Sequence, residues 1–344
     1  MSAIAIDVMG GDFGPSVTVP ASLDALQRHP DLQLHLVGDR PSIEEIVQDC
    51  AVDRALLQRL ELVHSESCVR DDDRPVTVLR GKRNSSMYLA VDQVRSGKAA
   101  ACVSAGNTGA LLLTGRHLLR MLPGIRKPAI IATIPVPALD RNCYLLDVGA
   151  TVHSDGEQLF QFGLMGAVVV ASLTGRKCPR VGLLNIGAEE YKGSREIHDA
   201  ARLFERSGAL EYVGFIEGDR LFSGDADVLV CDGFAGNLTI KSSAGVVHAV
   251  EQLIHQLATA DPDRSSMAAP LLDAIRQKIN PARFNGASLL GLQGIIVKSH
   301  GNADREAFTW AIEQAIKEVR NNVPVLIADR IASVFQTTSQ TNQE

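Results

Sequence analysis

Short runs of apolar residues recur along the chain, and most are continuous rather than alternating with polar residues. A continuous run is typical of a strand buried on both faces of a mostly parallel sheet. The pattern predicts strands at Ile4–Val8, Leu32–Val37, Ala100–Ser104, Ala129–Pro135, Cys143–Asp147, Arg180–Ile186, Val213–Glu217, Val228–Cys231 and Leu289–Val297.

Stretches with helical periodicity lie between these runs. They predict helices at Ser86–Gly97, Thr108–Met121, Asp155–Leu173, Arg195–Ser207, Asn237–Ala260 and Asn302–Asn321. Alternating strands and helices indicate a three-layer α/β/α fold with a mostly parallel sheet. A last short helix is expected from Pro324, followed by a flexible polar tail at 336–344. Because no low-complexity linker or internal repeat divides the chain, we expect one α/β domain at 1–335, with an inserted amphipathic helical segment at about 255–284.

Glycine-rich turns follow six of the predicted strands. In parallel sheets ligands bind at the carboxyl ends of strands, where helix N-termini expose unpaired N–H groups that favour anions. Glycine lets the backbone approach the ligand closely. A single such turn is often needed for geometry alone, but six together predict an anion site, and we interpret the anion as phosphate. The turns are residues 7–15, 104–110, 147–151, 185–193, 231–237 and 298–301.

Composition and missing motifs narrow the function. The formal net charge of -6 argues against nucleic-acid binding. The sequence lacks a dinucleotide fingerprint, a P-loop, a nucleophile elbow and a zinc-protease motif. We therefore predict no cofactor and no metal. The chain opens on an apolar strand without a basic leader, and its six cysteines are widely spaced, which is typical of reduced, mostly buried thiols. We expect a cytoplasmic protein that meets a membrane only at its surface.

These turns, in this order, resemble the bacterial phosphate acyltransferase family. The matching segments lie between residue 4 and about residue 310, and they are Ile6–Asp12, Ser104–Ala110, Leu146–Ala150, Leu184–Gly187, Cys231–Asn237, Leu289–Leu292 and Lys298–Gly301. The resemblance implies transfer of a long-chain fatty acyl group from acyl carrier protein to inorganic phosphate, for phospholipid synthesis. It also implies a fold similar to isocitrate dehydrogenase and phosphate acetyltransferase, a homodimer, peripheral attachment to the inner face of the cell membrane, and a functional link to a membrane glycerol-3-phosphate acyltransferase.

Three positions depart from the family's pattern. Thr151 stands where the family has Asn, and Ala188 and Ala244 stand where it has Glu, so we expect no catalytic role at these sites. The glycines, Lys192 and the pair of Lys298 and His300 fit the pattern.

The implied reaction makes few demands on the side chains of the site. Phosphate already carries nucleophilic oxygens and a thiol leaves easily, so catalysis needs positioning and oxyanion stabilisation rather than a strong base. The candidate catalytic residues are Lys192, Asn237, Lys298 and His300. Each lysine could instead be a solvated surface cation, and His300 could instead make only a structural hydrogen bond. The candidate phosphate- or substrate-binding residues are Gly10, Gly11, Asp12, Arg80, Lys82, Gly106, Asn107, Thr108, Gly149, Gly187, Asp232, Gly233 and Lys241.

Two charged segments suggest partners. The run from Arg80 to Ser86 fits phosphate binding, docking of the acidic carrier protein, or a merely solvated loop. Met267, Leu271, Leu272 and Ile275 share one face of a predicted basic helix, which fits membrane contact or packing in a dimer. The resemblance favours the membrane.

Three other functions remain open. One is a short-chain phosphate acyltransferase that uses coenzyme A, and the sequence does not fix chain length. Another is a metal- and nicotinamide-dependent decarboxylating dehydrogenase, for which neither an aspartate metal site nor an arginine cluster can be assembled from the sequence. The third is a membrane scaffold, which would not need so many glycine-lined strand ends.

Overall fold

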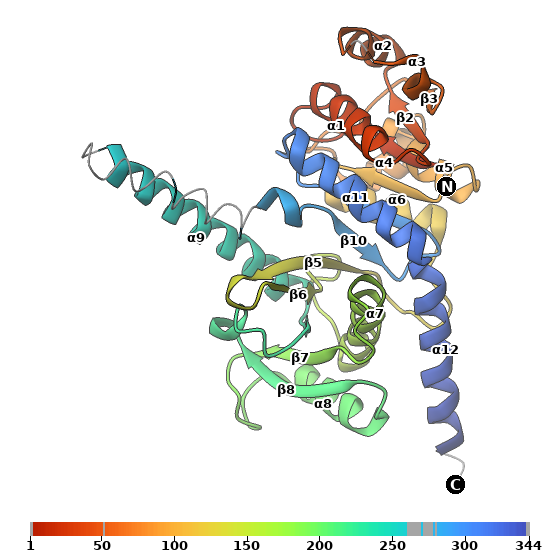
Figure 1. The fold of residues 1–344 in the computed structure, drawn as a ribbon. Coiled ribbons are helices and arrows are strands. Elements are labelled where there is room, and N and C mark those ends of the chain that lie inside the picture. The colour runs from red at the N-terminus through yellow and green to blue at the C-terminus, as the bar shows by residue number, and fades with distance from the viewer. Residues whose placement is uncertain (1–2, 51, 260–269, 271–277, 279–280, 342–344) are drawn as a thin grey trace.

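The computed structural model describes residues 3–341 apart from 51, 260–269, 271–277 and 279–280, and in that part of the chain eleven strands form one continuous sheet (Figure 1). The order across the sheet is β3-β2-β1-β4-β11-β10-β5-β6-β9-β7-β8. The strands are β1 (Ile4–Asp7), β2 (Leu34–Gly38), β3 (Leu60–His64), β4 (Ala101–Ser104), β5 (Ala129–Val136), β6 (Arg141–Leu146), β7 (Arg180–Asn185), β8 (Glu211–Glu217), β9 (Val228–Val230), β10 (Ala287–Leu290) and β11 (Ile295–Lys298).

Strand direction reverses in the middle of the sheet. β1, β2, β3, β4 and β11 are parallel to one another, and so are β6, β7, β8 and β9. Between the two sets lie three antiparallel pairings, β11 with β10, β10 with β5, and β5 with β6. An odd number of reversals means that the two parallel sets run in opposite directions.

Helices cover both faces of the sheet, so the predicted three-layer α/β/α class is confirmed. Over the first set of strands, α1 and α11 form one layer and α5 and α6 the other, each with its own apolar cluster. Over the second set, α7, α8 and α12 cover one face. The helices are α1 (Pro15–Arg28), α2 (Arg40–Asp49), α3 (Arg54–Leu57), α4 (Pro75–Gly81), α5 (Ser86–Arg95), α6 (Thr108–Leu119), α7 (Gly156–Thr174), α8 (Arg195–Ser207), α9 (Gly233–Thr259), α11 (Arg305–Asn321) and α12 (Val323–Thr341).

The apolar run at Leu289–Val297, predicted as one strand, forms two. β10 and β11 pair antiparallel, with Leu289 opposite Ile296. Gly291 begins the turn between them with a φ of 88°, a left-handed conformation that glycine adopts readily. Leu292 in that turn is buried in the cluster beneath α5 and α6, so the run is apolar throughout although it is not one strand.

Two other parts of the chain differ from the prediction. The last helix is not short, because α12 continues to Thr341 and so includes residues 336–341 of the expected tail. Val323, Ile327, Ile331 and Val334 are buried at helical spacing, which explains the length of the helix. The pattern also missed β3 and α1 to α4. The cysteines are less buried than expected: all six are free, and three of them are buried.

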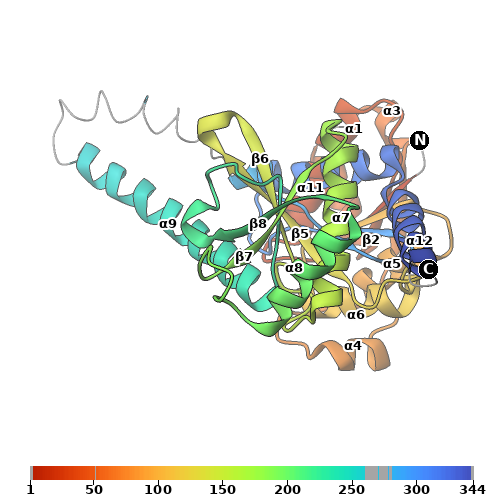
Figure 2. The same ribbon diagram turned by 90° about the horizontal axis from the view of Figure 1, so that it is seen from below.

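Helix α9 projects from the body of the molecule, away from α12 and the C-terminus (Figures 1 and 2). The apolar face predicted for membrane contact, Met267, Leu271, Leu272 and Ile275, lies outside the described residues. Helix α7 is the one described helix long and apolar enough to cross a membrane, but 72% of its apolar window is buried inside the protein. It is therefore best understood as a core helix.

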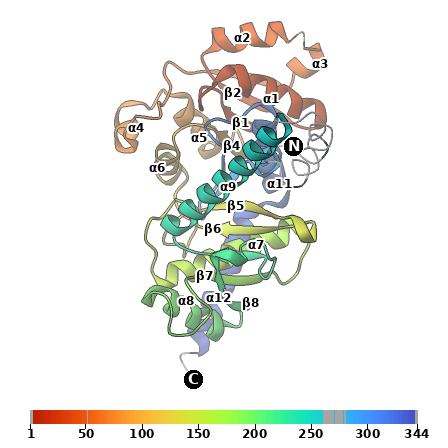
Figure 3. The same cartoon turned by 90° about the vertical axis from the view of Figure 1, so that its left-hand side faces the viewer.

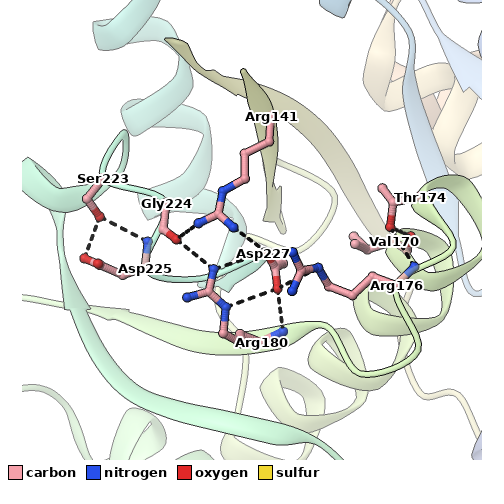
Figure 4. Close-up of polar contacts among 9 residues, drawn as sticks. All are labelled: Arg141, Val170, Thr174, Arg176, Arg180, Ser223, Gly224, Asp225 and Asp227. Atoms are coloured by element: carbon pink, nitrogen blue, oxygen red, sulfur yellow. Dashed lines mark hydrogen bonds and ion pairs between the residues drawn. The ribbon is translucent and has the colours of Figure 1, made fainter. Parts of the chain in front are cut away.

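A buried carboxylate ties the amino-terminal ends of β6, β7 and β9 together (Figure 4). Asp227, just before β9, contacts three arginines: Arg180 at 3.3 Å, Arg176 at 3.5 Å and Arg141 at 3.8 Å. The backbone N–H of Arg180 also donates to Asp227 at 2.8 Å. Arg141 and Arg180 both donate to the carbonyl of Gly224. This arginine cluster, which the sequence did not indicate, therefore binds the chain's own aspartate.

A second buried carboxylate makes stability depend on pH. Glu318 on α11 accepts hydrogen bonds from Ser288 on β10 and from Gln314, and burial raises its pKa to about 7. Between pH 4.5 and 7 the folded protein therefore holds a proton that the unfolded chain has lost. The free energy of unfolding falls as pH rises through this window, and it stays lower above it.

Replacing Glu318 by Gln is expected to stabilise the protein at pH 8 by about 2–3 kcal/mol, with little change at pH 5. Glutamine keeps the acceptor oxygen but carries no charge. Urea unfolding at both pH values measures the effect, with Glu205→Gln on the exposed face of α8 as the control. An equal change at both pH values would show that the Glu318 charge is not the cause.

Candidate active site

Turns after three adjacent parallel strands, β1, β4 and β11, meet at one place. The N–H of Asp12 donates to the carbonyl of Gly301 at 2.8 Å. A Cβ added to Gly10 would lie 2.7 Å from the nitrogen of Gly106, and one added to Gly11 would lie 2.8 Å from the oxygen of Gly301. Only glycine permits such close backbone approach. The structure thus brings these predicted residues together, and we call this the first turn group (residues 7–12, 104–108 and 298–301).

Helix α6 begins inside the first turn group. The Asn107 side chain caps it by accepting from the N–H of Ala110 at 2.9 Å, and its amide donates to the carbonyl of Asp71 at 2.8 Å. Thr108, the first helical residue, is exposed. The start of α6 therefore faces solvent with its first turn held rigidly by Asn107, as an anion site requires.

Lys298 supplies positive charge within this group. Its ammonium donates to the carbonyls of Ala105, at 3.1 Å, and of Ser299. Burial lowers the pKa of Lys298 to about 8, against the attraction of Asp71, Asp7 and Asp12, which raises it. Both of these hydrogen bonds are to neutral carbonyls, so among the described residues no carboxylate hydrogen-bonds to this ammonium. Lys298 is thus the strongest candidate for the group that contacts a bound anion.

The pH dependence of phosphate use should report the charge of Lys298. Because only the ammonium form attracts an anion, kcat/KM for phosphate is expected to fall as pH rises through about 8, the pKa of Lys298. Steady-state rates from pH 6.5 to 10 measure this limb. A Lys298→Arg variant that retains activity should lack the limb, since guanidinium does not titrate in this range. An unchanged limb in that variant would assign it to another group.

The buried carboxylate of Asp7 is linked to the Gly106 turn through the Ser104 hydroxyl. Ser104 donates to Asp7 Oδ2 at 2.6 Å and accepts from the N–H of Gly106 at 3.1 Å. Burial raises the pKa of Asp7, while the hydrogen bond from Ser104 and the charge of Lys298 lower it. This chain of contacts fixes the orientation of the Gly106 turn.

A second turn group follows β6, β9 and β7 (residues 147–152, 185–193 and 231–238). Asp147 Oδ1 accepts from the N–H groups of Ile130, Gly149 and Ala150, and Oδ2 accepts from that of Thr151. Burial raises the pKa of Asp147, and these four backbone donors lower it. Asp147 therefore holds the turn in shape from within.

Close packing joins this turn to the start of α9. A Cβ on Gly233 would lie 3.0 Å from the Cα of Gly149, and one on Gly149 would lie 3.7 Å from the Cβ of Asn237. Asp232 accepts from the N–H of Ala235 at 2.8 Å, so it stabilises the first turn of α9. The structure thus brings together Gly149, Asp232, Gly233 and Asn237, as predicted.

The loop after β7 is held by Asn185. Its amide donates to the carbonyls of Gly187 and Lys192, at 3.1 and 2.9 Å. The ammonium of Lys192 lies 2.9 Å from Glu189, and this hydrogen bond raises its pKa. Lys192 is thus paired within its own loop in this structure. Its predicted catalytic role stays a prediction.

The two turn groups do not share one edge of a parallel sheet, which corrects the arrangement expected from the sequence. Their strands run in opposite directions, because three antiparallel pairings separate them. They are nevertheless linked by packing: Val148 and Ala150 contact the apolar cluster that contains Met87, Ala110 and Leu111. The Asp147 turn therefore packs against the same apolar cluster that includes residues of α6, the helix that begins in the first turn group.

Four predicted residues lie apart from these central contacts. His300 is exposed, and its N–H donates to Asn285 at 2.9 Å. Lys241 is exposed on α9, and Arg80 is exposed on α4. Lys82 donates to the carbonyl of Cys68 and pairs with Asp73, so it holds residues 68–73 in place.

Sequence reasoning gave no site role to Ser104 or Asn185. The signal available was their position, because each is a polar residue at the end of an otherwise apolar strand. Within the part of the chain that the structure describes, no cluster of three or more His, Cys, Asp or Glu side chains has an arrangement able to hold a metal ion.

Glycine-lined turns, a partly buried ammonium and a capped helix start are features that suit an enzyme with an anionic substrate. A family described as fatty acid synthesis protein matches residues 2–326. Proteins named phosphate acyltransferase from Shewanella sp. strain W3-18-1 and Shewanella putrefaciens are each 46% identical over 338 residues, which is 96% of this chain and 97% of theirs. The chain belongs to this family. It is an acyltransferase, and its reaction class is acyl transfer to phosphate.

Solved structures support the fold. A phosphotransacetylase from Streptococcus pyogenes matches with a TM-score of 0.62 at 14% identity, over 93% of this chain and 94% of that one. A 4-hydroxythreonine-4-phosphate dehydrogenase from Klebsiella pneumoniae matches with a TM-score of 0.53 at 14% identity, over 93% of this chain and 100% of that one. Identities this low concern the fold alone.

Proposed function

We propose that this chain transfers a long-chain fatty acyl group from acyl carrier protein to inorganic phosphate, giving acyl phosphate and free carrier protein for phospholipid synthesis. The observation that carries the proposal is the partly buried ammonium of Lys298 beside the close-packed glycines of the first turn group. A cation and backbone donors in a rigid, partly buried setting suit a phosphate that must be positioned more than activated.

The reaction balances without a covalent enzyme intermediate. An oxygen of hydrogen phosphate attacks the thioester carbon, the C–O bond forms, and the tetrahedral oxyanion collapses with loss of the C–S bond. The proton of the phosphate passes to the leaving thiolate. In this proposal Lys298 and the N–H groups at Gly106–Thr108 hold phosphate, Asn237 and Lys192 face the oxyanion, and His300 carries the proton. Arg80, Lys82 and Lys241 add positive charge for the donor.

Partners and location follow the same proposal. The exposed Arg80 on α4 supports docking of an acidic carrier protein near the start of α6. Val246, Val250 and Leu253 are exposed at helical spacing on the projecting part of α9, which supports a homodimer built on this helix. We further propose a cytoplasmic enzyme with peripheral contact at the inner face of the cell membrane through residues 267–275, where a membrane glycerol-3-phosphate acyltransferase would take the product.

One assay tests the function directly. The purified protein is mixed with hexadecanoyl-loaded acyl carrier protein, with and without phosphate, and acyl phosphate is trapped by hydroxylamine as the hydroxamate. Phosphate-dependent hydroxamate is the expected result. Thioester loss that does not depend on phosphate, or no product from any acyl donor, would overturn the proposal. Vesicle co-sedimentation of a Leu271→Glu, Ile275→Glu variant tests the membrane face.

A further inference from the structure

Five large apolar side chains stand exposed around the second turn group. They are between 56% and 80% accessible to solvent, although they lie in the turns that the predicted chemistry uses. We call them the apolar rim, and they are Val152, Ile186, Tyr191, Phe234 and Leu238.

The apolar rim is contiguous through three adjacent strands. β9 lies between β6 and β7, so the turns that carry Val152, Phe234 and Ile186 are neighbours. The N–H of Phe234 donates to the carbonyl of Val152 at 3.3 Å. Leu238 follows Phe234 by one turn of α9 and shares its face. Figure 3 shows α9 crossing in front of β5 and β6 as it leaves this part of the molecule.

Exposure of this kind indicates an apolar ligand. Single exposed apolar residues are ordinary, but a contiguous patch in monomeric proteins commonly marks a binding surface. Each side chain gains about 25 cal/mol for every Å² of apolar surface that a ligand covers. Two of the charged groups in these turns have partners of their own, since Glu189 pairs with Lys192 and Asp232 accepts from the N–H of Ala235. A ligand without charge therefore fits best.

The place of the rim relative to the proposed reaction site indicates which apolar ligand it binds. Its first member, Val152, ends the turn whose Val148 and Ala150 pack against the cluster of α6, and α6 begins at the phosphate-binding turn group. Tyr191 directly precedes Lys192 and Leu238 directly follows Asn237, the two residues that the proposal places at the oxyanion, so a chain attached to the reacting carbonyl would lie beside the rim. Resting on the proposed function, we infer that the apolar rim binds the aliphatic chain of the acyl donor and sets the enzyme's preference for long chains.

Two further surfaces differ from the rim. Val246, Val250 and Leu253 lie more than one turn farther along α9, on the projecting part of the helix. Phe222, in the segment between β8 and β9, and Val325, on α12, are exposed and lie outside the turns that carry the rim, so they provide apolar controls. The rim is thus separable by mutation from the surface proposed for the dimer.

The test compares donors of different chain length. Wild type and a Phe234→Ala, Leu238→Ala variant are assayed with acyl carrier protein loaded with hexadecanoyl or butanoyl chains. The variant is expected to lose at least about tenfold in kcat/KM with hexadecanoyl donor, and less than about twofold with butanoyl donor. A Phe222→Ala, Val325→Ala variant should match wild type with both.

The outcomes separate this inference from the proposed function. Equal loss with both donors, or no loss with either, overturns the role of the rim. A variant that loses activity only as its mass falls to that of a monomer assigns the rim to a second copy of the chain and also overturns the inference. If wild type shows no phosphate-dependent product with either donor, the proposed function itself fails. Wild type that prefers the butanoyl donor overturns the chain-length inference and the long-chain part of the proposed function, and leaves acyl transfer to phosphate intact.

Discussion

Replacing Lys298 by methionine is expected to lower kcat/KM for phosphate by roughly 10²–10³-fold. Methionine keeps the length of the apolar stem and removes the ammonium. The pKa of Lys298 lies near 8 because of burial, so at pH 7 wild type carries a desolvated positive charge. An interaction between such a charge and an anion is stronger than the same interaction in water. Rates at varied phosphate, with saturating acyl donor, measure the loss.

The control is Lys317→Met, because Lys317 is exposed on α11 and lies outside both turn groups. Its kcat/KM should stay within about twofold of wild type. Far-ultraviolet circular dichroism and thermal unfolding establish that both variants fold. Full activity in the Lys298→Met protein would remove Lys298 from the site and leave the reaction class intact, whereas a loss limited to the KM of the acyl donor would assign Lys298 to that substrate.

Most of the fold could be predicted because buried strands leave a clear sequence signal. β1 and β4 are fully buried and read as short continuous apolar runs. The missed strand, β3, lies at the edge of the sheet, and its partly exposed side chains mix Glu61 and His64 with leucine and valine. Pro20 inside α1 similarly obscures a helix. Where packing is only partial, the local pattern weakens.

The residues of the candidate site could be named from the sequence, but their arrangement could not. The glycines and Lys298 could be named as candidates because their residue types and their positions after predicted strands can be seen in the sequence. The reversal of β10 depends on a four-residue turn within an apolar run, and it is one of the three antiparallel pairings that make the strands before the two turn groups run in opposite directions. The contacts of Asp7 with Ser104 join residues 97 positions apart. No local pattern encodes such a pairing.

The second large effect concerns stability. Replacing Asp227 by alanine is expected to lower the free energy of unfolding by about 3–5 kcal/mol, because it leaves Arg141, Arg176 and Arg180 close together without their shared anion. The Asp227 side chain is only 5% exposed, so water cannot replace it easily. Urea unfolding measures the loss, and the melting temperature should fall by roughly 4–7 °C.

Asp225→Ala is the matched control, since Asp225 lies two residues away and pairs with Arg220 at the surface. An exposed pair of this kind contributes at most about 1 kcal/mol. Equal losses in the two variants would mean that the three-arginine cluster is no more than a set of surface contacts.

Asp227 lies at the amino-terminal ends of β6, β7 and β9, whereas the second turn group follows their carboxyl ends. The Asp227→Ala protein, assayed well below its melting temperature, should therefore keep its kcat/KM for phosphate within about twofold. The substitution lies at the opposite ends of these strands from the second turn group, and distant sites usually act independently.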